Sequence, residues 1–159
     1  MRKPLVWFFR VCLTVSTILL VDDDLENRWA LQQVLESRGY RVVLAHNGRD
    51  ALRKVHAEFP ELVITDLEMP EMDGGELCRR LKREAAFPDL PVVLLSSMPE
   101  PTDRGGCWTA FLRKPASIEA LFDAVDRFIA VRLTCVQTPR VPEHANVVRW
   151  PAIDSRCWP

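Results

Sequence analysis

The chain has 159 residues, of which 48% are hydrophobic and 27% are charged, and its formal net charge is −1. This composition is that of a folded domain, and the near-zero charge excludes a general attraction to nucleic acid or to an anionic membrane. The five cysteines are scattered without a Cys-x-x-Cys pair, which argues against structural zinc and a disulfide framework and favours a reduced, cytoplasmic setting.

The first segment precedes any regular pattern. Its basic start and the apolar residues 5–9 resemble a secretory signal, but Arg10 interrupts the apolar run. A helix that spans a bilayer needs roughly 20 apolar residues, which this segment lacks. We therefore predict a poorly ordered N-terminal extension over residues 1–16, with a weak membrane-surface anchor as the alternative.

The first strand-and-helix unit begins with the apolar residues 18–21, which are typical of a buried parallel strand. Three aspartates, Asp22 to Asp24, follow this run directly. A helical pattern comes next, and Gly39 is a suitable C-terminal stop for it. The residues expected to face inward from this helix are Leu25, Trp29, Val34 and Leu35.

Two further units repeat the pattern. Residues 41–45 and residues 62–65 are predicted strands, and the second leads directly into Asp66. Asn47 can cap the helix after the first strand, and Asp73 with Gly74 opens the helix after the second. The predicted inward stripes of these helices are Ala51, Leu52, Val55 and Phe59, then Leu77, Cys78 and Leu81.

The last part of the pattern contains two short strands and one helix. Residues 92–95 form a predicted strand that ends at Ser96, and residues 110–112 form another that precedes Lys114. Ser117 can cap the final helix, which has the most regular helical period in the chain. Its predicted inward face is Ile118, Leu121, Phe122, Val125, Phe128 and Ile129.

Two segments depart from this alternation. Between the fourth and fifth predicted strands, Pro99, Pro101 and a Gly-Gly pair oppose helix formation, so a helix there is expected to be one turn or absent. Trp108 is expected to cover the core that such a helix would protect. Residues 132–159 contain four prolines and no periodic pattern, and we predict a flexible C-terminal tail.

Repeated strand-and-helix units predict an α/β domain over residues 17–131, with a doubly wound parallel sheet covered on both faces. In such sheets, ligands bind beyond the carboxyl ends of the strands. The polar residues at those ends are Asp22, Asp23, Asp66, Ser96 and Lys114. We therefore expect these five side chains to converge at one edge of the sheet.

The five side chains favour one kind of chemistry. Clustered carboxylates repel one another unless a cation neutralises them, and an all-oxygen set favours Mg²⁺. A hydroxyl and an ammonium group supply the donors and the positive charge that phosphoryl oxygens require. The combination indicates phosphoryl transfer onto a carboxylate.

Four stretches carry a family resemblance. They are Ile-Leu-Leu-Val-Asp-Asp-Asp at 18–24, Leu-Val-Ile-Thr-Asp-Leu-Glu-Met-Pro-Glu-Met-Asp-Gly at 62–74, Pro-Val-Val-Leu-Leu-Ser at 91–96 and Phe-Leu-Arg-Lys-Pro at 111–115. Together they resemble the response-regulator receiver domains of two-component signalling, which belong to the CheY-like superfamily. The resemblance implies a flavodoxin-like, five-stranded sheet in the order 2-1-3-4-5. It also implies phosphotransfer from a sensor histidine kinase or a histidine phosphotransfer protein.

The same resemblance assigns roles to the site residues. Asp66 would be the phosphoacceptor, and Lys114, joined to Pro115 by a cis bond, would contact the phosphoryl group. The ligands of Mg²⁺ would be Asp22 (mainly through water), Asp23, Asp66 and the backbone carbonyl of Glu68.

Further positions would control the signal. Ser96 would bind a phosphoryl oxygen on activation, and Phe111 would be the aromatic residue that moves inward with it. Glu68 and Met98 occupy positions that tune the lifetime of the phosphoryl group, and we predict slow self-hydrolysis from them. Gly74 is expected to supply a backbone angle that other residues resist.

We therefore expect a single-domain response regulator that switches its binding to a downstream protein target. It would not be an enzyme beyond slow self-dephosphorylation, and it would contact neither nucleic acid nor a membrane directly. One alternative is a receiver-like binding module that works without phosphorylation. A second is a haloacid-dehalogenase-type phosphatase with Asp22 as nucleophile, and a third is a fragment of a longer regulator or hybrid kinase.

Overall fold

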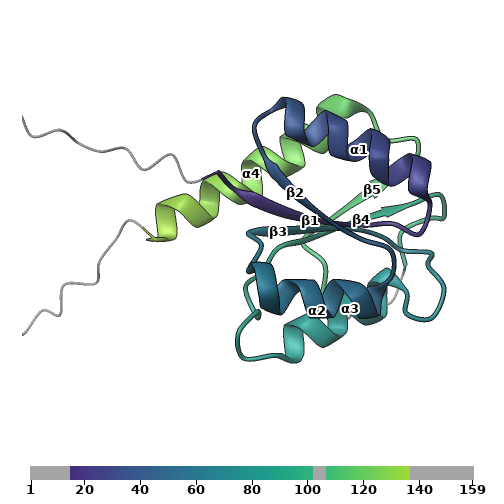
Figure 1. The fold of residues 1–159 in the computed structure, drawn as a ribbon, viewed down its shortest axis with the longest axis horizontal. Helices are drawn as coiled ribbons and strands as arrows, with labels where there is room; N and C mark the ends of the chain where they lie inside the picture. Colours follow the sequence, from purple (N-terminus) through teal and green to yellow (C-terminus); the bar gives the residue numbers. More distant parts are fainter. Residues whose placement is uncertain (1–14, 102–106, 137–159) are drawn as a thin grey trace, which may run out of the picture.

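The computed structural model describes residues 15–101 and 107–136, without the side chains of residues 131–136. The strands are β1 Thr17–Val21, β2 Arg41–Ala45, β3 Leu62–Asp66, β4 Val92–Ser96 and β5 Ala110–Arg113; the helices are α1 Leu25–Ser37, α2 Gly48–Glu58, α3 Gly74–Arg83 and α4 Ile118–Val136. One sheet lies between two layers, with α1 and α4 on one face and α2 and α3 on the other (Figure 1). This is the predicted doubly wound α/β architecture.

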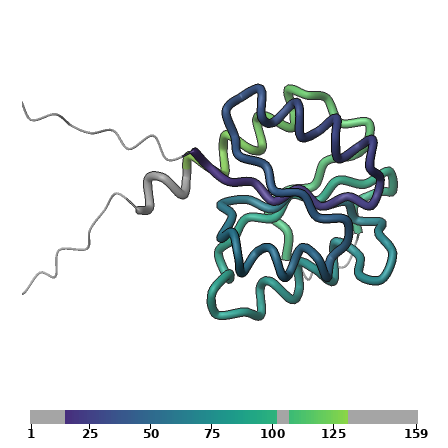
Figure 2. The backbone as a smooth tube through the Cα atoms, viewed as in Figure 1, coloured from purple at the N-terminus to yellow at the C-terminus, as the bar shows by residue number. Residues whose placement is uncertain are grey.

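The sheet is parallel throughout and has the order β2-β1-β3-β4-β5, which confirms the expected topology. Its register aligns the carboxyl ends of the strands, because Val21 pairs with both Ala45 and Thr65. The chain winds over one face after β1, over the other after β2 and β3, and returns after β5 (Figure 2). The strand order therefore reverses between β1 and β3, where folds of this class bind ligands.

Each face of the sheet has its own buried core, because successive strand residues point to opposite faces. Leu19 and Val63 belong to the core shared with α2 and α3, whereas Ile18 and Ile64 belong to the core shared with α1 and α4. All four are fully buried. Complete burial of one such side chain contributes about 1.5–3 kcal/mol, so these apolar strands hold the sheet between its helices.

The predicted helix caps are present. The Asn47 side chain accepts a hydrogen bond from the Asp50 N–H at 2.8 Å, and Asp73 accepts one from the Glu76 N–H at 2.6 Å. Gly39 follows α1 with a φ of +87°, a conformation that glycine adopts without strain. These local signals fix where the helices begin and end.

Four large side chains that were expected to face inward are exposed instead: Leu25 (69%), Trp29 (64%), Phe59 (67%) and Ile118 (51%). In α1 the packed face is formed by Leu31, Val34 and Leu35, whose three- and four-residue spacing defines one side of a helix. Trp29 lies away from that side. Phe59 follows the last turn of α2 with a left-handed φ of 45°, which takes it out of the helical stripe.

Two segments depart from the regular alternation of strands and helices or from the predicted end of the domain. Residues 97–101 and 107–109, the described part of the connection between β4 and β5, contain no helix, as its prolines predicted. At the other end, α4 continues beyond residue 131 to Val136. The remainder of the predicted extension and tail, residues 1–14 and 137–159, lies outside the described residues. Within the described part of the chain, no helix is both long and apolar enough to span a bilayer.

Candidate functional site

The acidic rim, which we define as Asp22, Asp23, Asp66 and Lys114, lies at the carboxyl ends of the strands. Asp22 and Asp23 follow β1, and Asp66 is the last residue of β3. One carboxylate oxygen from each aspartate lies within 4.8 Å of the other two. Asp22 and Asp66 are buried, whereas Asp23 is exposed, so the cluster meets solvent on the Asp23 side.

Lys114 joins the cluster from the end of β5. Its Nζ donates hydrogen bonds to Asp66 Oδ2 at 2.5 Å and to Asp22 Oδ2 at 3.2 Å. Its backbone N–H donates to the Ser96 carbonyl at 2.7 Å, and the bond to Pro115 is cis, as expected. The sheet thus brings together groups that are far apart in the sequence.

The charges of the acidic rim influence one another. Burial, with a smaller contribution from the charge of Asp66, raises the pKa of Asp22 by more than the Asp24 N–H and Lys114 lower it. Burial alone would lower the pKa of Lys114, but the hydrogen bond to Asp66 and the charges of Asp22 and Asp66 outweigh it and raise that pKa. Lys114 therefore keeps its proton at neutral pH, and a single ammonium group faces three carboxyl groups.

This donor set fits a hard divalent cation. Oxygen ligands suit Mg²⁺, which is usually held by one or two carboxylates and keeps several waters. A divalent ion would also relieve the repulsion among carboxylates that one lysine leaves uncompensated. The structure gathers the side chains of Asp22, Asp23 and Asp66. The fourth predicted ligand, the carbonyl of Glu68, belongs to the loop that follows β3 directly.

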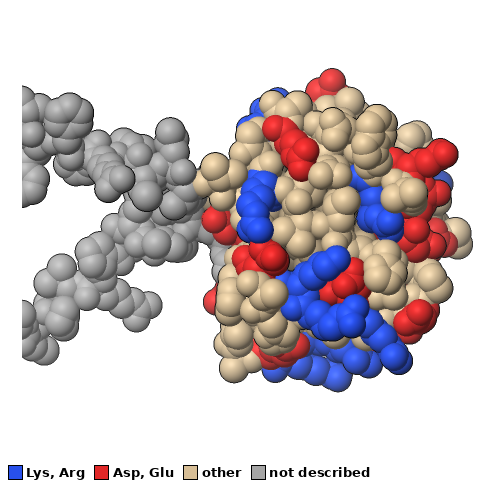
Figure 3. Space-filling view, viewed as in Figure 1, with Lys and Arg blue, Asp and Glu red and all other residues tan. Residues whose placement is uncertain are grey.

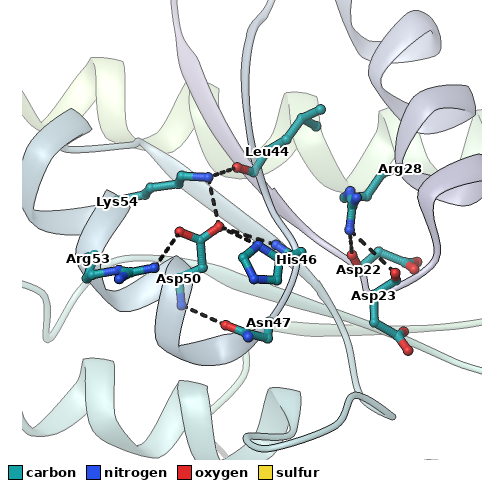
Figure 4. A network of polar contacts seen from close by, with 9 residues as sticks. All are labelled: Asp22, Asp23, Arg28, Leu44, His46, Asn47, Asp50, Arg53 and Lys54. Carbon is teal, nitrogen blue, oxygen red and sulfur yellow. Dashed lines mark hydrogen bonds and ion pairs between the residues drawn. The ribbon is translucent and has the colours of Figure 1, made fainter.

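The loop after β1 is held from α1 by a residue that the sequence reasoning missed. Arg28 Nη1 donates to the Asp22 carbonyl at 2.6 Å and lies 3.5 Å from the Asp23 carbonyl (Figure 4). Asp24, the third aspartate of the run, caps α1 by accepting from the Asn27 N–H at 2.9 Å. The available signal was spacing, since Arg28 lies one helical turn beyond this cap.

Gly74 is required for a different reason from the one expected. Its φ is not left-handed, and Gly39 is the one glycine of the described residues with a positive φ. A Cβ atom on Gly74 would instead lie 2.3 Å from the Asp66 carbonyl oxygen. The first turn of α3 therefore packs directly on the backbone of Asp66, and only glycine permits this approach.

Ser96 and Phe111 lie on neighbouring strands. Ser96 is fully buried, and it follows Leu95, the residue that pairs with Asp66. Its hydroxyl accepts a hydrogen bond from the Met98 N–H at 2.9 Å. Phe111 is partly buried and packs against the core under α2 and α3. The structure therefore places Ser96 beside the acidic rim, whereas Phe111 packs against the edge of the core and stays partly exposed.

Glu68 and Met98 occupy the loops after β3 and β4. Both side chains are exposed, with Met98 at 55%. The Glu68 N–H donates to Asp66 Oδ1 at 3.1 Å, which orients the carboxylate. The two loops flank the end of the sheet where the acidic rim opens to solvent.

A cavity of about 380 Å³ lies next to the loop after β3. It is lined by Leu67, Glu68, Pro101, Cys107 and Trp108, among others. Trp108 packs against the core, as expected, and its Nε1 donates to Glu100 Oε1 at 3.0 Å. The cavity therefore borders both the loop after Asp66 and the described residues of the connection between β4 and β5.

A second polar network lies beside the acidic rim and was not found by sequence reasoning (Figure 4). Asp50 on α2 is buried, and Lys54 and Arg53 donate to it at 2.8 and 3.2 Å. Burial raises the pKa of Asp50, but these hydrogen bonds, together with the charge of Lys54 and the His46 N–H, outweigh burial and lower the pKa overall. Lys54 also donates to the Leu44 carbonyl at 2.5 Å, which ties α2 to β2. The sequence signal for this network is the three- and four-residue spacing between Asp50 and the basic residues Arg53 and Lys54.

Comparison with known sequences agrees with this geometry. A family model described as the response regulator receiver domain matches residues 18–126. The C4-dicarboxylate transport transcriptional regulatory protein DctD of Pseudomonas aeruginosa is 37% identical over 122 residues, which cover 74% of this chain and 26% of that protein. Response regulator MprA of Mycolicibacterium vanbaalenii is 37% identical over 108 residues, covering 65% of this chain and 46% of the relative. The chain thus spans less than half the length of these relatives.

Solved structures show the same fold. The signal receiver domain of a signal transduction histidine kinase from Syntrophus aciditrophicus is 33% identical with a TM-score of 0.69, over 79% of this chain and 96% of that one. The chemotaxis response regulator CheY4 of Vibrio cholerae is 28% identical with a TM-score of 0.66, over 72% and 99% of the two chains. Since the family model matches more than half of the sequence and the fold and acidic rim agree with it, this chain belongs to the response regulator receiver domain family.

Proposed function

We propose that this domain accepts a phosphoryl group on Asp66 from a sensor histidine kinase or a histidine phosphotransfer protein. The observation that carries the proposal is the position of the Asp66 carboxylate, which accepts a hydrogen bond from Lys114 and shares its cluster with two further carboxylates. A carboxylate that attacks phosphorus needs positive charge at the phosphoryl oxygens. Lys114 supplies one such charge, and the carboxylates can hold another.

In the proposed transfer, an Asp66 oxygen attacks the phosphorus of a phosphohistidine. The O–P bond forms as the N–P bond breaks, and the imidazole leaves with the electron pair. Lys114 exchanges its hydrogen bond to Asp66 for one to a phosphoryl oxygen. Asp22, Asp23, Asp66 and the Glu68 carbonyl would hold Mg²⁺, which supplies further positive charge at the transferred group.

Ser96 and Phe111 are the residues we propose for the switch. The Ser96 oxygen accepts from Met98, which leaves its own O–H as a donor for a phosphoryl oxygen. Phe111 is only partly buried, so an inward rotation would bury more of its ring. Together these movements would alter the surface beside β5.

The proposed phosphoryl lifetime is long, and the domain would not be an enzyme beyond slow self-dephosphorylation. The Glu68 carboxylate would repel an approaching hydroxide-like water, and the thioether of Met98 cannot orient one as a base would. Glu68→Gln keeps the size and removes the charge, so we expect faster decay of the phosphorylated form. A control change at an exposed, distant carboxylate, Asp89→Asn, should leave the decay unchanged.

We propose that the output is a protein contact made in the cytoplasm. Basic side chains gather over α2 and α3 (Figure 3), but many of them are paired with acids. Arg53 and Lys54 contact Asp50, and Arg80 contacts Glu76 at 2.8 Å. Paired charges offer little net attraction to phosphates, so we propose no direct nucleic-acid contact for this domain. DctD is named as a transcriptional regulator, and the matched region covers 26% of it, so the proposal concerns the receiver domain alone.

Phosphorylation with acetyl phosphate tests the central step. Intact-mass spectrometry of the wild type should show one phosphoryl adduct in Mg²⁺ and far less in excess chelator. Asp66→Asn should show none, while Asp89→Asn, a matched change at an exposed site, should behave like the wild type. An adduct that persists in Asp66→Asn, or that ignores the chelator, would refute the proposal.

The absence of a helix from residues 97–101 and 107–109 favours one second candidate, a binding module that works without phosphate. Hydrogen exchange distinguishes the two functions. The phosphoacceptor proposal expects exchange in residues 97–113 to change on phosphorylation. The alternative expects identical exchange in the two forms.

A further inference from the structure

Two cysteines from separate parts of the chain meet beside the cavity. Cys78 is fully buried on the inner side of α3, and Cys107 lies in the connection before β5; both are free thiols. Cys107 Sγ donates a long hydrogen bond, 3.8 Å, to the carbonyl of Gly75. Gly75 lies one turn before Cys78, and helical side chains lean over the turn that precedes them. The two sulfur atoms therefore approach the same turn of α3.

The two thiols differ in their surroundings. Burial, with a contribution from the neighbouring Cys107 thiol, raises the pKa of Cys78, so it stays protonated at neutral pH. Cys107 is only partly buried and lines the cavity of about 380 Å³. A small solute can enter a cavity of this volume, so Cys107 is the thiol that a soluble oxidant meets first.

We propose that Cys78 and Cys107 form a redox-sensitive pair, in which hydrogen peroxide closes a disulfide between α3 and the connection to β5. The Cys107 sulfur attacks one peroxide oxygen, which gives a sulfenic acid and one water. The Cys78 sulfur then attacks the sulfenic sulfur; the S–S bond forms, and the Cys78 proton leaves with the hydroxyl group as a second water. Two thiols are oxidised by two electrons, and one peroxide is reduced to water.

The disulfide would restrain the switch. Cys107 lies between Ser96 and Phe111 in the chain, and the cavity it lines also borders Leu67 and Glu68 in the loop after Asp66. A covalent link from this segment to α3 would oppose movement of Ser96 and Phe111. This consequence rests on the proposed phosphoacceptor function. Coupling between sites in proteins is typically 5–150-fold, so oxidation should slow phosphorylation of Asp66 at least about fivefold.

The first experiment tests the link itself. The full chain with Cys12, Cys135 and Cys157 replaced by serine is treated with hydrogen peroxide, blocked with an alkylating agent and digested without reductant. We expect a peptide pair joined through Cys78 and Cys107, which disappears after dithiothreitol. Cys107→Ser is the matched control, because Cys107 is partly exposed whereas a change at buried Cys78 risks the fold. A Cys107 that is oxidised without forming the linked peptide would overturn the proposal.

The second experiment tests the restraint. The rate of phosphorylation by acetyl phosphate is compared between the oxidised protein, the same sample after dithiothreitol and Cys107→Ser given the same oxidant. We expect slowing only in the oxidised protein and recovery on reduction. A linked protein that is phosphorylated as fast as the reduced one would overturn the regulatory role. If the reduced protein accepts no phosphoryl group, the Asp66 proposal fails, and the linked peptide still decides the thiol pair.

Discussion

The acidic rim and the connection between β4 and β5 are neighbours, but hydrogen bonds hold the side chains of the first in place far more than those of the second. In the acidic rim, Lys114 donates hydrogen bonds to the carboxylates of Asp66 and Asp22. Arg28 donates hydrogen bonds to the backbone carbonyls of Asp22 and Asp23. In the connection, the described residues form no helix, and Trp108 lies over a cavity. The difference shows that the chemical site and the surface beside it are determined by separate stretches of sequence.

Without a helix in the described residues of this connection, β5 is still anchored at its start. The Thr109 N–H donates to the Val92 carbonyl at 2.7 Å, and the Thr109 hydroxyl accepts from the Val92 N–H at 3.1 Å. These two hydrogen bonds between Thr109 and Val92 set the register of β5 on β4. Lys114 therefore reaches the acidic rim whether or not a helix precedes β5.

The largest effect is expected from Gly74→Ala. A Cβ there would lie 2.3 Å from the Asp66 carbonyl oxygen, a backbone atom that cannot rotate away. We expect a loss of about 3 kcal/mol in the free energy of unfolding, measured by urea denaturation. Gly75→Ala is the matched control, since its nearest contact is the Asp73 side chain at 3.3 Å, and it should change stability by less than about 1 kcal/mol. Equal effects would show that the acidic rim is not held by this close approach.

Trp108→Ala tests how much the connection depends on one side chain. Trp108 packs on the core and bonds Glu100, so its removal should cost about 2 kcal/mol, less than a fully buried tryptophan. Trp29→Ala removes the same side chain from a site that is 64% exposed and should cost less than about 0.5 kcal/mol. If Trp108→Ala proves as mild as Trp29→Ala, the tryptophan does not protect the core.

These contrasts also show what the sequence can predict. The convergence of Asp22, Asp23, Asp66 and Lys114 follows from their places at strand ends, where period and topology position residues without packing detail. The strand order, by contrast, was implied by the family resemblance. The burial of α1 could not be predicted as reliably, because apolar residues occur on both of its sides and only contact with the sheet selects Leu35 over Trp29. Close approaches such as that of Gly74 depend on the three-dimensional backbone path.

Asp22→Asn should stabilise the protein when no metal is added. Because burial raises the pKa of Asp22 in the folded state, the unfolded chain ionises first as pH rises from below the usual value of 3.8. Stability therefore falls through that window, and the penalty persists at about pH 7. We expect Asp22→Asn to raise the denaturation midpoint at about pH 7 and to leave it unchanged at about pH 3. A loss of stability at about pH 7 would contradict this account of the acidic rim.

Tyr40 lies at the amino ends of the strands, away from the acidic rim and from the connection between β4 and β5, and its pKa serves as a reference for that end of the fold. Burial, followed by the hydrogen bond to Asp126 and its charge, raises the pKa of Tyr40 to about 12. The chain has one tyrosine, so an absorbance titration reports this group alone. We expect a midpoint of about 12, and a lower midpoint in Asp126→Asn. A midpoint near the ordinary value of 10 would show that the far end of the fold differs from this description.

The chemical location of the phosphoryl group tests the central claim most directly. After reaction with acetyl phosphate and Mg²⁺, borohydride reduces an aspartyl phosphate to homoserine, which peptide mass spectrometry assigns to one position. The geometry of the acidic rim predicts homoserine at Asp66 and at no other aspartate. Homoserine at Asp22, the outcome expected of a phosphatase nucleophile, or its absence from folded protein that binds Mg²⁺, would contradict the proposed phosphoacceptor.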